Sequence, residues 1–331
     1  MTQGFSRFSF RLFSVYGEFF FCTVEADDNC IDYIPGVPAM SPTDLPSFLQ
    51  ATEMSNFMLH VIFLSFQCVR EADWVLTNSV YELETEEIQY SMQTTTPLCS
   101  VGPLLPSGYF DSHEALDSDL ERWLDSKPRH SVIYVSLGEC ARVSESQIEE
   151  IAVGLLESRI PFFWALPPET VNSAASLSEI LPAGFLDQIK DKGVVSSNWS
   201  RHHHLALLSH RSVGGFFTPC DWNSVLQGLC NGVPLLGFPL HADQYTNCKL
   251  VSDEMGIAMK VRHSGIEGET IGRKEIARNV KALMRGGEGK KVRKNMKRFK
   301  RVATKATIEG GSSAANLDNF VEELVDKIMI G

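Results

Sequence analysis

Short apolar runs alternate with helix-patterned segments through the middle of this chain, and that alternation constrains the fold more than any other feature. The clearest helical pattern covers residues 145–156. Strand-like segments that alternate with helical ones predict a parallel sheet with helices on both faces, which is the α/β class. The expected strands are residues 131–137, 162–166, 194–196, 213–218 and 233–238.

Turn-forming and acidic residues divide the chain into segments. A strand expected at 74–77 and the turn at 101–103 close a first region, and an acidic, loosely patterned stretch follows. Apolar residues at helical spacing predict a final helix at 315–328. We therefore expect a first domain over residues 1–104, a linker over 105–127, a second domain over 128–309 and a C-terminal segment over 310–331.

The composition is typical of a globular chain. With 331 residues, 44% of them hydrophobic and 21% charged, it is long enough for two domains with their own cores. A net charge of −11 argues against general binding to nucleic acid or to an anionic membrane. No uncharged run reaches the ~18 residues that a membrane span needs. The eight cysteines include no Cys-x-x-Cys pair, so we expect reduced thiols and a cytoplasmic location.

Residues 213–224 combine a strand with the start of a helix. The strand contains two adjacent glycines, which let a backbone or a ligand approach closely. Polar Asp221, Asn223 and Ser224 then precede apolar residues at helical spacing, which marks a helix start. Unpaired N–H groups and the helix dipole make such a start a favourable seat for a phosphate. The alternative is that these polar side chains only cap the helix.

A second strand and a polar pair follow directly. Residues 233–239 form another apolar run, and Asp243 and Gln244 lie just beyond its carboxyl end. Open α/β sheets bind ligands at this end of their strands. Two neighbouring loops therefore both carry candidate ligand-binding side chains.

The stretch from 213 to 244 resembles the nucleotide-sugar signature of the plant family 1 UDP-glycosyltransferases. That signature includes Gly-Gly-Phe-x-Thr-His-Cys-Gly-Trp-Asn-Ser and a later Asp-Gln, and most of it is present here. Residues 31–37, 181–185 and 310–313 are similar to other stretches of the same family. The resemblance implies a GT-B-like fold of two Rossmann-like domains with parallel sheets, and we expect the N-terminal domain to be incomplete. An incomplete parallel sheet exposes a strand edge, which predicts self-association.

The resemblance also implies a reaction. Members of the family transfer a hexose, expected here to be glucose, from a UDP-sugar to a hydroxyl of a small-molecule acceptor with inversion. UDP-glucose is then a donor substrate, and neither a cofactor nor a metal is expected. The family's catalytic histidine and its aspartate partner lie in the N-terminal half. This chain is expected to start after both, so the catalytic residues are unknown, and a catalytically impaired remnant or binding protein is the alternative function.

Residues that match the family pattern take donor-binding roles by resemblance. Asn223 and Ser224 would contact the UDP phosphates. Asp243 and Gln244 would hydrogen-bond the sugar hydroxyls. Trp222 matches as well, with a packing role beside the donor.

Three positions on the donor side depart from the pattern. Pro219 replaces a histidine that donates to the phosphate, and proline has neither an imidazole nor a backbone N–H. Asp221 replaces a glycine and would repel a diphosphate, by about 4 kcal/mol for unit charges 4 Å apart near a protein surface. Gln227 replaces the glutamate that holds the ribose hydroxyls, and it keeps an acceptor oxygen.

The uracil side of the signature is also altered. Arg201 stands at the family tryptophan position and His204 at the glutamine position, while Trp199 lies two residues earlier. Gly138 and Glu139 follow the strand 131–137 and are expected to border the donor. The uracil contacts of this chain are therefore expected to differ from those of the family.

Two charged segments are explained without a ligand. Consecutive side chains at 202–204 point in different directions on any regular element, so we expect a solvated histidine loop rather than a metal site. The basic run 290–301 carries apolar residues at helical spacing and predicts a surface helix with one packed face.

Overall fold

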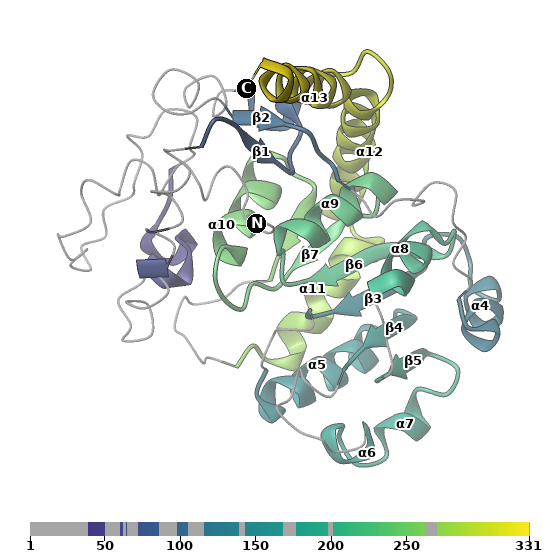
Figure 1. The fold of residues 1–331 in the computed structure, drawn as a ribbon. Coiled ribbons are helices and arrows are strands. Elements are labelled where there is room, and N and C mark those ends of the chain that lie inside the picture. Colours follow the sequence, from purple (N-terminus) through teal and green to yellow (C-terminus); the bar gives the residue numbers. More distant parts are fainter. Residues whose placement is uncertain are drawn as a thin grey trace. The chain divides into compact units, whose positions relative to one another are not determined.

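The described part of the chain forms two compact units, whose ribbon is drawn in Figure 1. The first takes in the chain up to residue 106 together with 241–250 and 298–331, and the second takes in 107–240 and 251–297. Residues 31–37, one of the segments similar to the family, lie outside the described part. The structure is a computed structural model that describes residues 39–49, 60, 61, 64, 72–85, 98–104, 116–138, 143–167, 177–197, 201–261 and 270–330.

A six-stranded parallel sheet forms the centre of the second unit. Its strand order is β5-β4-β3-β6-β7-β8, so the sheet extends in both directions from the central pair β3 and β6. The five predicted strands are confirmed. The sixth was missed because β8 is only three residues long and ends in a lysine. The bounds are β3 Val132–Ser136, β4 Phe162–Ala165, β5 Gly193–Ser196, β6 Val213–Thr218, β7 Leu235–Gly237 and β8 Ala258–Lys260.

Helices cover both faces of this sheet (Figure 1). On one face, α5 and α11 pack against each other and against the strands. On the other face, His204 of α8 meets the ring of Tyr134 on β3, and Gly228 of α9 lies against Leu235 on β7. The bounds are α5 Glu145–Ser158, α6 Leu177–Ile180, α7 Phe185–Gln188, α8 Arg201–Ser209, α9 Trp222–Asn231 and α11 Arg273–Arg285.

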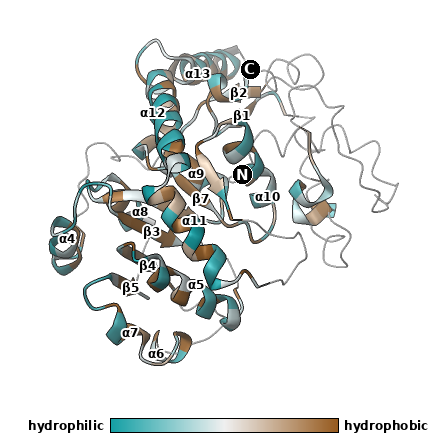
Figure 2. Cartoon of the chain, turned by 180° about the vertical axis from the view of Figure 1, so that it is seen from behind, coloured by the Kyte–Doolittle hydropathy of each residue, from teal (hydrophilic) through white to brown (hydrophobic). Residues whose placement is uncertain are grey.

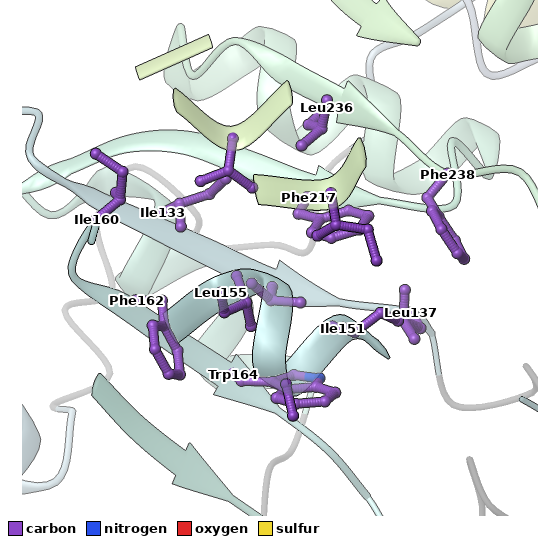
Figure 3. Close-up of a cluster of buried hydrophobic side chains, with 14 of the residues drawn as sticks. Ile133, Leu137, Ile151, Leu155, Ile160, Phe162, Trp164, Phe217, Leu236 and Phe238 are labelled. Atoms are coloured by element: carbon purple, nitrogen blue, oxygen red, sulfur yellow. The ribbon is translucent and has the colours of Figure 1, made fainter. Parts of the chain in front are cut away.

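Side chains of β3 alternate between the two faces, as strand geometry requires. Ile133 and Val135 enter the core that α5 and α11 cover, and Figure 3 shows Ile133 and Leu155 of α5 in this cluster. Tyr134 points to the opposite face, where its ring stacks on Phe216 with 4.9 Å between centroids. The strands read as continuous apolar runs because both faces of the sheet are buried.

Hydrogen bonds of polar side chains also connect α5 to the start of α11. The buried Gln147 amide bonds both backbone groups of Ile271, donating to the carbonyl at 3.1 Å and accepting from the N–H at 2.7 Å. Glu150 accepts from Nε of Arg273 at 2.9 Å. This bond to the guanidinium holds the pKa of Glu150 below its usual value. The two helices are therefore held by directional bonds as well as by apolar contact.

Gly214 sits at an irregularity between the two central strands. Val132 pairs with Val213, whereas the next residue of β3 pairs with Gly215, so Gly214 is the extra residue of a β-bulge. A Cβ at Gly214 would lie 2.2 Å from the carbonyl oxygen of His130. The close approach of another backbone therefore explains this glycine without a ligand.

The stretch 105–127, predicted to be a linker, contains helix α4 (Ser118–Asp125). Asp117 caps this helix by accepting two backbone N–H groups of its first turn. Leu120 and Leu124, one turn apart, are buried. The helix was missed because its apolar residues Leu120, Trp123 and Leu124 stand among many charged residues in a short segment.

Asp125, at the end of α4, binds residues of the turn between α8 and β6. Its carboxylate accepts from Nη2 of Arg211 at 3.0 Å and lies 3.6 Å from Nε2 of His210. Burial is the main cause that lowers the pKa of His210, and Asp125 opposes that effect. Nδ1 of the imidazole lies 2.8 Å from the hydroxyl of Ser212.

The first unit contains a two-stranded parallel sheet, β1 (Val75–Thr77) and β2 (Leu98–Ser100). Asn316 of the C-terminal helix donates to the Ser100 carbonyl at 2.8 Å, which places that helix along β2. The helix predicted at 315–328 is confirmed and extends further at both ends. The remaining elements are the 3-10 helices η1 Pro42–Asp44, η2 Ser47–Leu49 and η3 Tyr81–Leu83, then α10 Gln244–Lys249, the π-helical turn Leu250–Glu254 and α13 Ser312–Ile330.

The basic run 290–301 lies in α12 (Gly287–Thr307), a helix that runs from the second unit into the first. Val292 and Met296 are buried, whereas most of the lysines around them are exposed. The hydrophilic bands along α12 are visible in Figure 2. A surface helix with one packed face is therefore confirmed. Within the described residues, no helix combines the length and the apolar character that crossing a membrane requires.

Replacing Gly214 with alanine is expected to lower the free energy of unfolding by about 1–3 kcal/mol, the usual range for overpacking. The new methyl group would collide with the His130 carbonyl. Gly287→Ala is the matched control, because nothing lies within 4 Å of the position that its Cβ would take. Urea denaturation followed by circular dichroism measures both variants. A Gly214 variant as stable as the unaltered protein would contradict the bulge explanation.

Candidate functional site

The order of strands reverses between β3 and β6, and the loops that follow these strands are the candidate ligand site of the second unit. Open α/β sheets bind ligands at such a point, beyond the carboxyl ends of the strands. Gly138 follows β3 and Pro219 follows β6, and a Cβ on Gly138 would lie 4.0 Å from Cγ of Pro219. Gly138 has a φ of 85°, which glycine adopts without strain. The fold thus brings together two donor-side positions that are 81 residues apart in the printed sequence.

Helix α9 begins at this point, and Asp221 is its N-cap. Oδ1 of Asp221 accepts from the backbone N–H of Ser224 at 3.0 Å, and Oδ2 accepts from the Ser224 hydroxyl at 2.6 Å. The capping interpretation therefore describes these two residues in the structure. The Ser224 hydroxyl thus donates to a carboxylate of the protein, and its expected contact with a phosphate stays a prediction.

The other residues of α9 that are expected to bind the UDP-sugar differ in their exposure to solvent. Asn223 is exposed in the first turn, where a ligand at the helix N-terminus can reach its amide. Trp222 is 1% exposed and packs in the interior. Gln227 is half-buried one turn further along, and its backbone carbonyl accepts from Asn231 at 2.8 Å. Asn223 is therefore the most exposed side chain of this group.

The turn between β6 and α9 depends on a residue that the sequence reasoning did not single out. Cys220 is fully buried and has a φ of 67°, a left-handed conformation that is uncommon for a residue with a Cβ. Its N–H donates to the hydroxyl of Thr218 at 3.3 Å. This turn sets the direction in which α9 leaves the sheet. The only local signal was the turn-prone proline that precedes the cysteine.

The histidines at 202–204, predicted to form a solvated loop, lie in α8. His204 is half-buried, and its Nδ1 lies 2.7 Å from the hydroxyl of Tyr134 on β3. The loop prediction is wrong because Leu207 and Leu208, both buried, anchor this segment as a helix on the sheet. His204 bonds α8 to the sheet, and its expected contact with the donor stays a prediction.

Three positions expected to border the donor fall outside the described residues or side chains. Trp199 and Glu139 lie outside the described residues, and the side chain of Arg201 is not described. Their contacts with a donor stay predictions. In the described part of the chain, no group of three or more histidine, cysteine or acidic side chains is arranged to hold a metal ion.

Asp243 and Gln244 lie in the first unit, at the start of α10, and both are buried. Oδ2 of Asp243 accepts from the Asn247 amide at 2.8 Å. Oε1 of Gln244 accepts from the backbone N–H of His241 at 3.0 Å. Each side chain is therefore oriented by a bond within its own segment. A carboxylate and a carboxamide held in this way offer acceptors and donors suited to sugar hydroxyls.

Known sequences similar to this chain are sugar transferases. Residues 107–305 match the family of UDP-glucoronosyl and UDP-glucosyl transferases. UDP-glycosyltransferase 86A1 of Arabidopsis thaliana is 38% identical over 313 residues, which cover 93% of this chain and 62% of that protein. (R)-mandelonitrile beta-glucosyltransferase of Prunus dulcis is 34% identical over 311 residues, which cover 90% and 61% respectively. The chain thus spans about three fifths of the length of these relatives.

Solved structures extend the likeness to the fold. The structure of Phytolacca americana UGT2 with UDP-2fluoro-glucose and pterostilbene has a TM-score of 0.81 at 31% identity, covering 96% of this chain and 68% of that one. Os79 of O. sativa in complex with UDP has a TM-score of 0.77 at 29% identity, covering 87% and 64%. With the parallel sheets described above, these matches show the GT-B-like α/β fold. On the evidence of the sequence match and the shared fold, the chain belongs to the UDP-glucoronosyl and UDP-glucosyl transferase family.

Proposed function

We propose that this chain binds a UDP-sugar and takes part in the transfer of its hexose, glucose in the simplest case, to a hydroxyl of a small-molecule acceptor. The observation that carries the proposal is the start of α9 at the strand-order reversal of a Rossmann-like sheet. Phytolacca americana UGT2, a relative of the same fold, has a solved structure in complex with UDP-2fluoro-glucose and pterostilbene. Because the chain covers about three fifths of its curated relatives, the activity is proposed for the protein of which these units form part.

The start of α9 suits the diphosphate of such a donor. A helix N-terminus presents backbone N–H groups and a partial positive charge to an anion. The exposed Asn223 amide adds a hydrogen-bond donor at this helix start. Gly138 presents no side chain from the facing loop. Gln227, one turn further along, is the proposed acceptor for a ribose hydroxyl. His204, hydrogen-bonded to Tyr134 of β3, is a further proposed contact of the UDP-sugar, and Trp222 supports the site by packing.

The hexose is assigned to Asp243 and Gln244. Their buried, hydrogen-bonded side chains support a preorganised site, which loses little entropy when a sugar binds. In the proposed reaction, the acceptor oxygen attacks the anomeric carbon while the bond to UDP breaks, so the configuration inverts. UDP leaves with the electrons of that bond, and a base takes the acceptor proton. None of the described residues is assigned as that base.

A cytoplasmic location belongs to the same proposal. The eight cysteines of the sequence include no Cys-x-x-Cys pair and are too few for a disulfide-rich scaffold. Reduced thiols persist in reducing compartments, whereas secreted proteins tend to form disulfides.

UDP and UDP-glucose are expected to raise the midpoint of thermal unfolding, because a ligand that binds only the native state stabilises it. We expect dissociation constants weaker than about 1 μM, since Asp221 places a carboxylate at the phosphate seat. Isothermal titration calorimetry measures them, with glucose alone as the control that lacks the diphosphate. No stabilisation by either nucleotide at about 10 mM would overturn the proposal.

Replacing Asp221 with asparagine is expected to tighten UDP binding about tenfold or more, because the negative charge beside the diphosphate is lost. Stability should change little, since asparagine caps helices as well as aspartate does. Asp221→Gly should also tighten binding, with a loss of a few tenths of a kcal/mol of stability. Asp117→Asn, which alters the cap of α4, is the matched control and should leave UDP affinity unchanged. Unchanged affinity in both Asp221 variants would place the defect elsewhere, with Pro219→His as the next reversion.

Self-association is proposed through the exposed apolar face of α13. Leu317, Val321 and Val325 follow one another at intervals of one turn and are 40%, 48% and 51% exposed. Burying such a face against another chain is favourable. Sedimentation velocity over a range of concentrations should show dimers that dissociate in Val321→Glu but not in the control Asn319→Glu. A monomer at every concentration would contradict this prediction.

A further inference from the structure

The loop that carries Asp243 is bound by a residue from a distant part of the first unit. The backbone N–H of Ser47 donates to the carbonyl of Ala242 at 2.9 Å, and the N–H of Ala242 donates to Oγ of Ser47 at 2.8 Å. The two residues are 195 positions apart in the sequence. Both polar groups of the Ala242 backbone are therefore satisfied by a single serine.

Ala242 needs such support because its backbone is strained. Its φ is 54°, in the left-handed region. For a residue with a Cβ this conformation costs roughly 1–2 kcal/mol, and it persists where the surrounding structure determines it. Asp243 and Gln244 follow immediately, so the direction of the chain at Ala242 decides where their side chains point.

Asp44 provides a second attachment beside the first. Its carbonyl accepts from the hydroxyl of the fully buried Thr246 at 2.8 Å, and its carboxylate lies 4.0 Å from Nζ of Lys249. The same carboxylate accepts from the hydroxyl of Ser41 at 2.6 Å, which fixes Asp44 within η1. α10 is therefore held along its length, while the turn before it depends on Ser47.

We propose that Ser47 is a positioning residue for the hexose of the donor. Its hydroxyl holds Ala242 in the left-handed conformation that directs Asp243 and Gln244 toward the sugar. This inference rests on the proposed binding of the hexose by those two residues. Ser47 itself makes no contact with the sugar in this account and acts through the Ala242 backbone.

A positioning role for Ser47 predicts different effects on the affinity for UDP-glucose and on the affinity for UDP. Removing the Ser47 hydroxyl leaves the Ala242 N–H without its acceptor and lets the strained turn relax. The side chains of Asp243 and Gln244 then shift with the turn that precedes them, so contacts with a hexose weaken. UDP has no hexose, and its diphosphate is assigned to α9, which Ser47 does not support. Ser47→Ala should therefore weaken UDP-glucose binding and leave UDP binding unchanged.

The experiment measures the dissociation constants of UDP and UDP-glucose for each variant by calorimetry and compares their ratio. Ser47→Ala is expected to weaken UDP-glucose binding relative to UDP binding about five- to tenfold, the loss expected for one hydrogen bond. Ser47→Thr keeps the hydroxyl and should restore the ratio of the unaltered protein. Thr43→Ala, which removes an exposed hydroxyl from η1, is the matched control and should leave the ratio unchanged.

Asp243→Asn distinguishes failure of this inference from failure of the proposed function. If Asp243→Asn shifts the ratio and Ser47→Ala does not, the hexose site stands and the positioning role is overturned. A Ser47→Thr variant that folds and shifts the ratio as alanine does would overturn it as well. If Asp243→Asn leaves the ratio unchanged, or the unaltered chain binds neither nucleotide, the proposed function fails and the inference fails with it.

Discussion

The pairing of β3 with β6 is the contact on which the second unit depends. The sheet extends from this pair in both directions, and helices bury both of its faces. Neither strand can shift by one residue without turning its side chains toward the wrong face. The bulge at Gly214 sets where the pairing resumes, and hence where β6 ends and α9 begins. The position of the candidate phosphate seat is thus a consequence of strand register.

At that seat, stability and ligand binding compete for the same groups. The N–H groups of a first helical turn have no partners within the helix, so they bind either a side chain or a ligand. Asp221 supplies the acceptor in this chain, and it also engages the Ser224 hydroxyl. Such a cap contributes about 1 kcal/mol to stability, whereas the repulsion of a nearby phosphate can reach about 4 kcal/mol. A carboxylate at this position therefore stabilises the folded protein and opposes binding of the donor's diphosphate.

At the proposed sugar end of the site, hydrogen bonds within the protein orient the side chains. Asp243 and Gln244 are oriented by bonds within their own segment, and the strained turn before them is held by Ser47. Aspartate and glutamine can bind many partners when they are free to move. Burial and the long-range bonds give them a single arrangement, which is the property that recognition of sugar hydroxyls requires.

Local pattern by itself determined much of the fold. Five strands, the helix that starts at 145, the C-terminal helix and the polar start of α9 follow from periodicity and from capping residues, which are local properties. The same local view failed for α4 and α8, because packing against distant residues, such as Tyr134 beneath His204, decides those helices.

The functional arrangement was decided by the tertiary structure. The strand order, the bulge at Gly214 and the bonds between Ser47 and Ala242 join residues far apart in the chain. No local pattern encodes which of many apolar strands will pair, or which serine will meet a strained turn. Those choices depend on the burial of both sheet faces and on hydrogen bonds that form only once the chain has folded. The sequence by itself indicated which residues could bind a donor, and the fold decided how their side chains are buried and oriented.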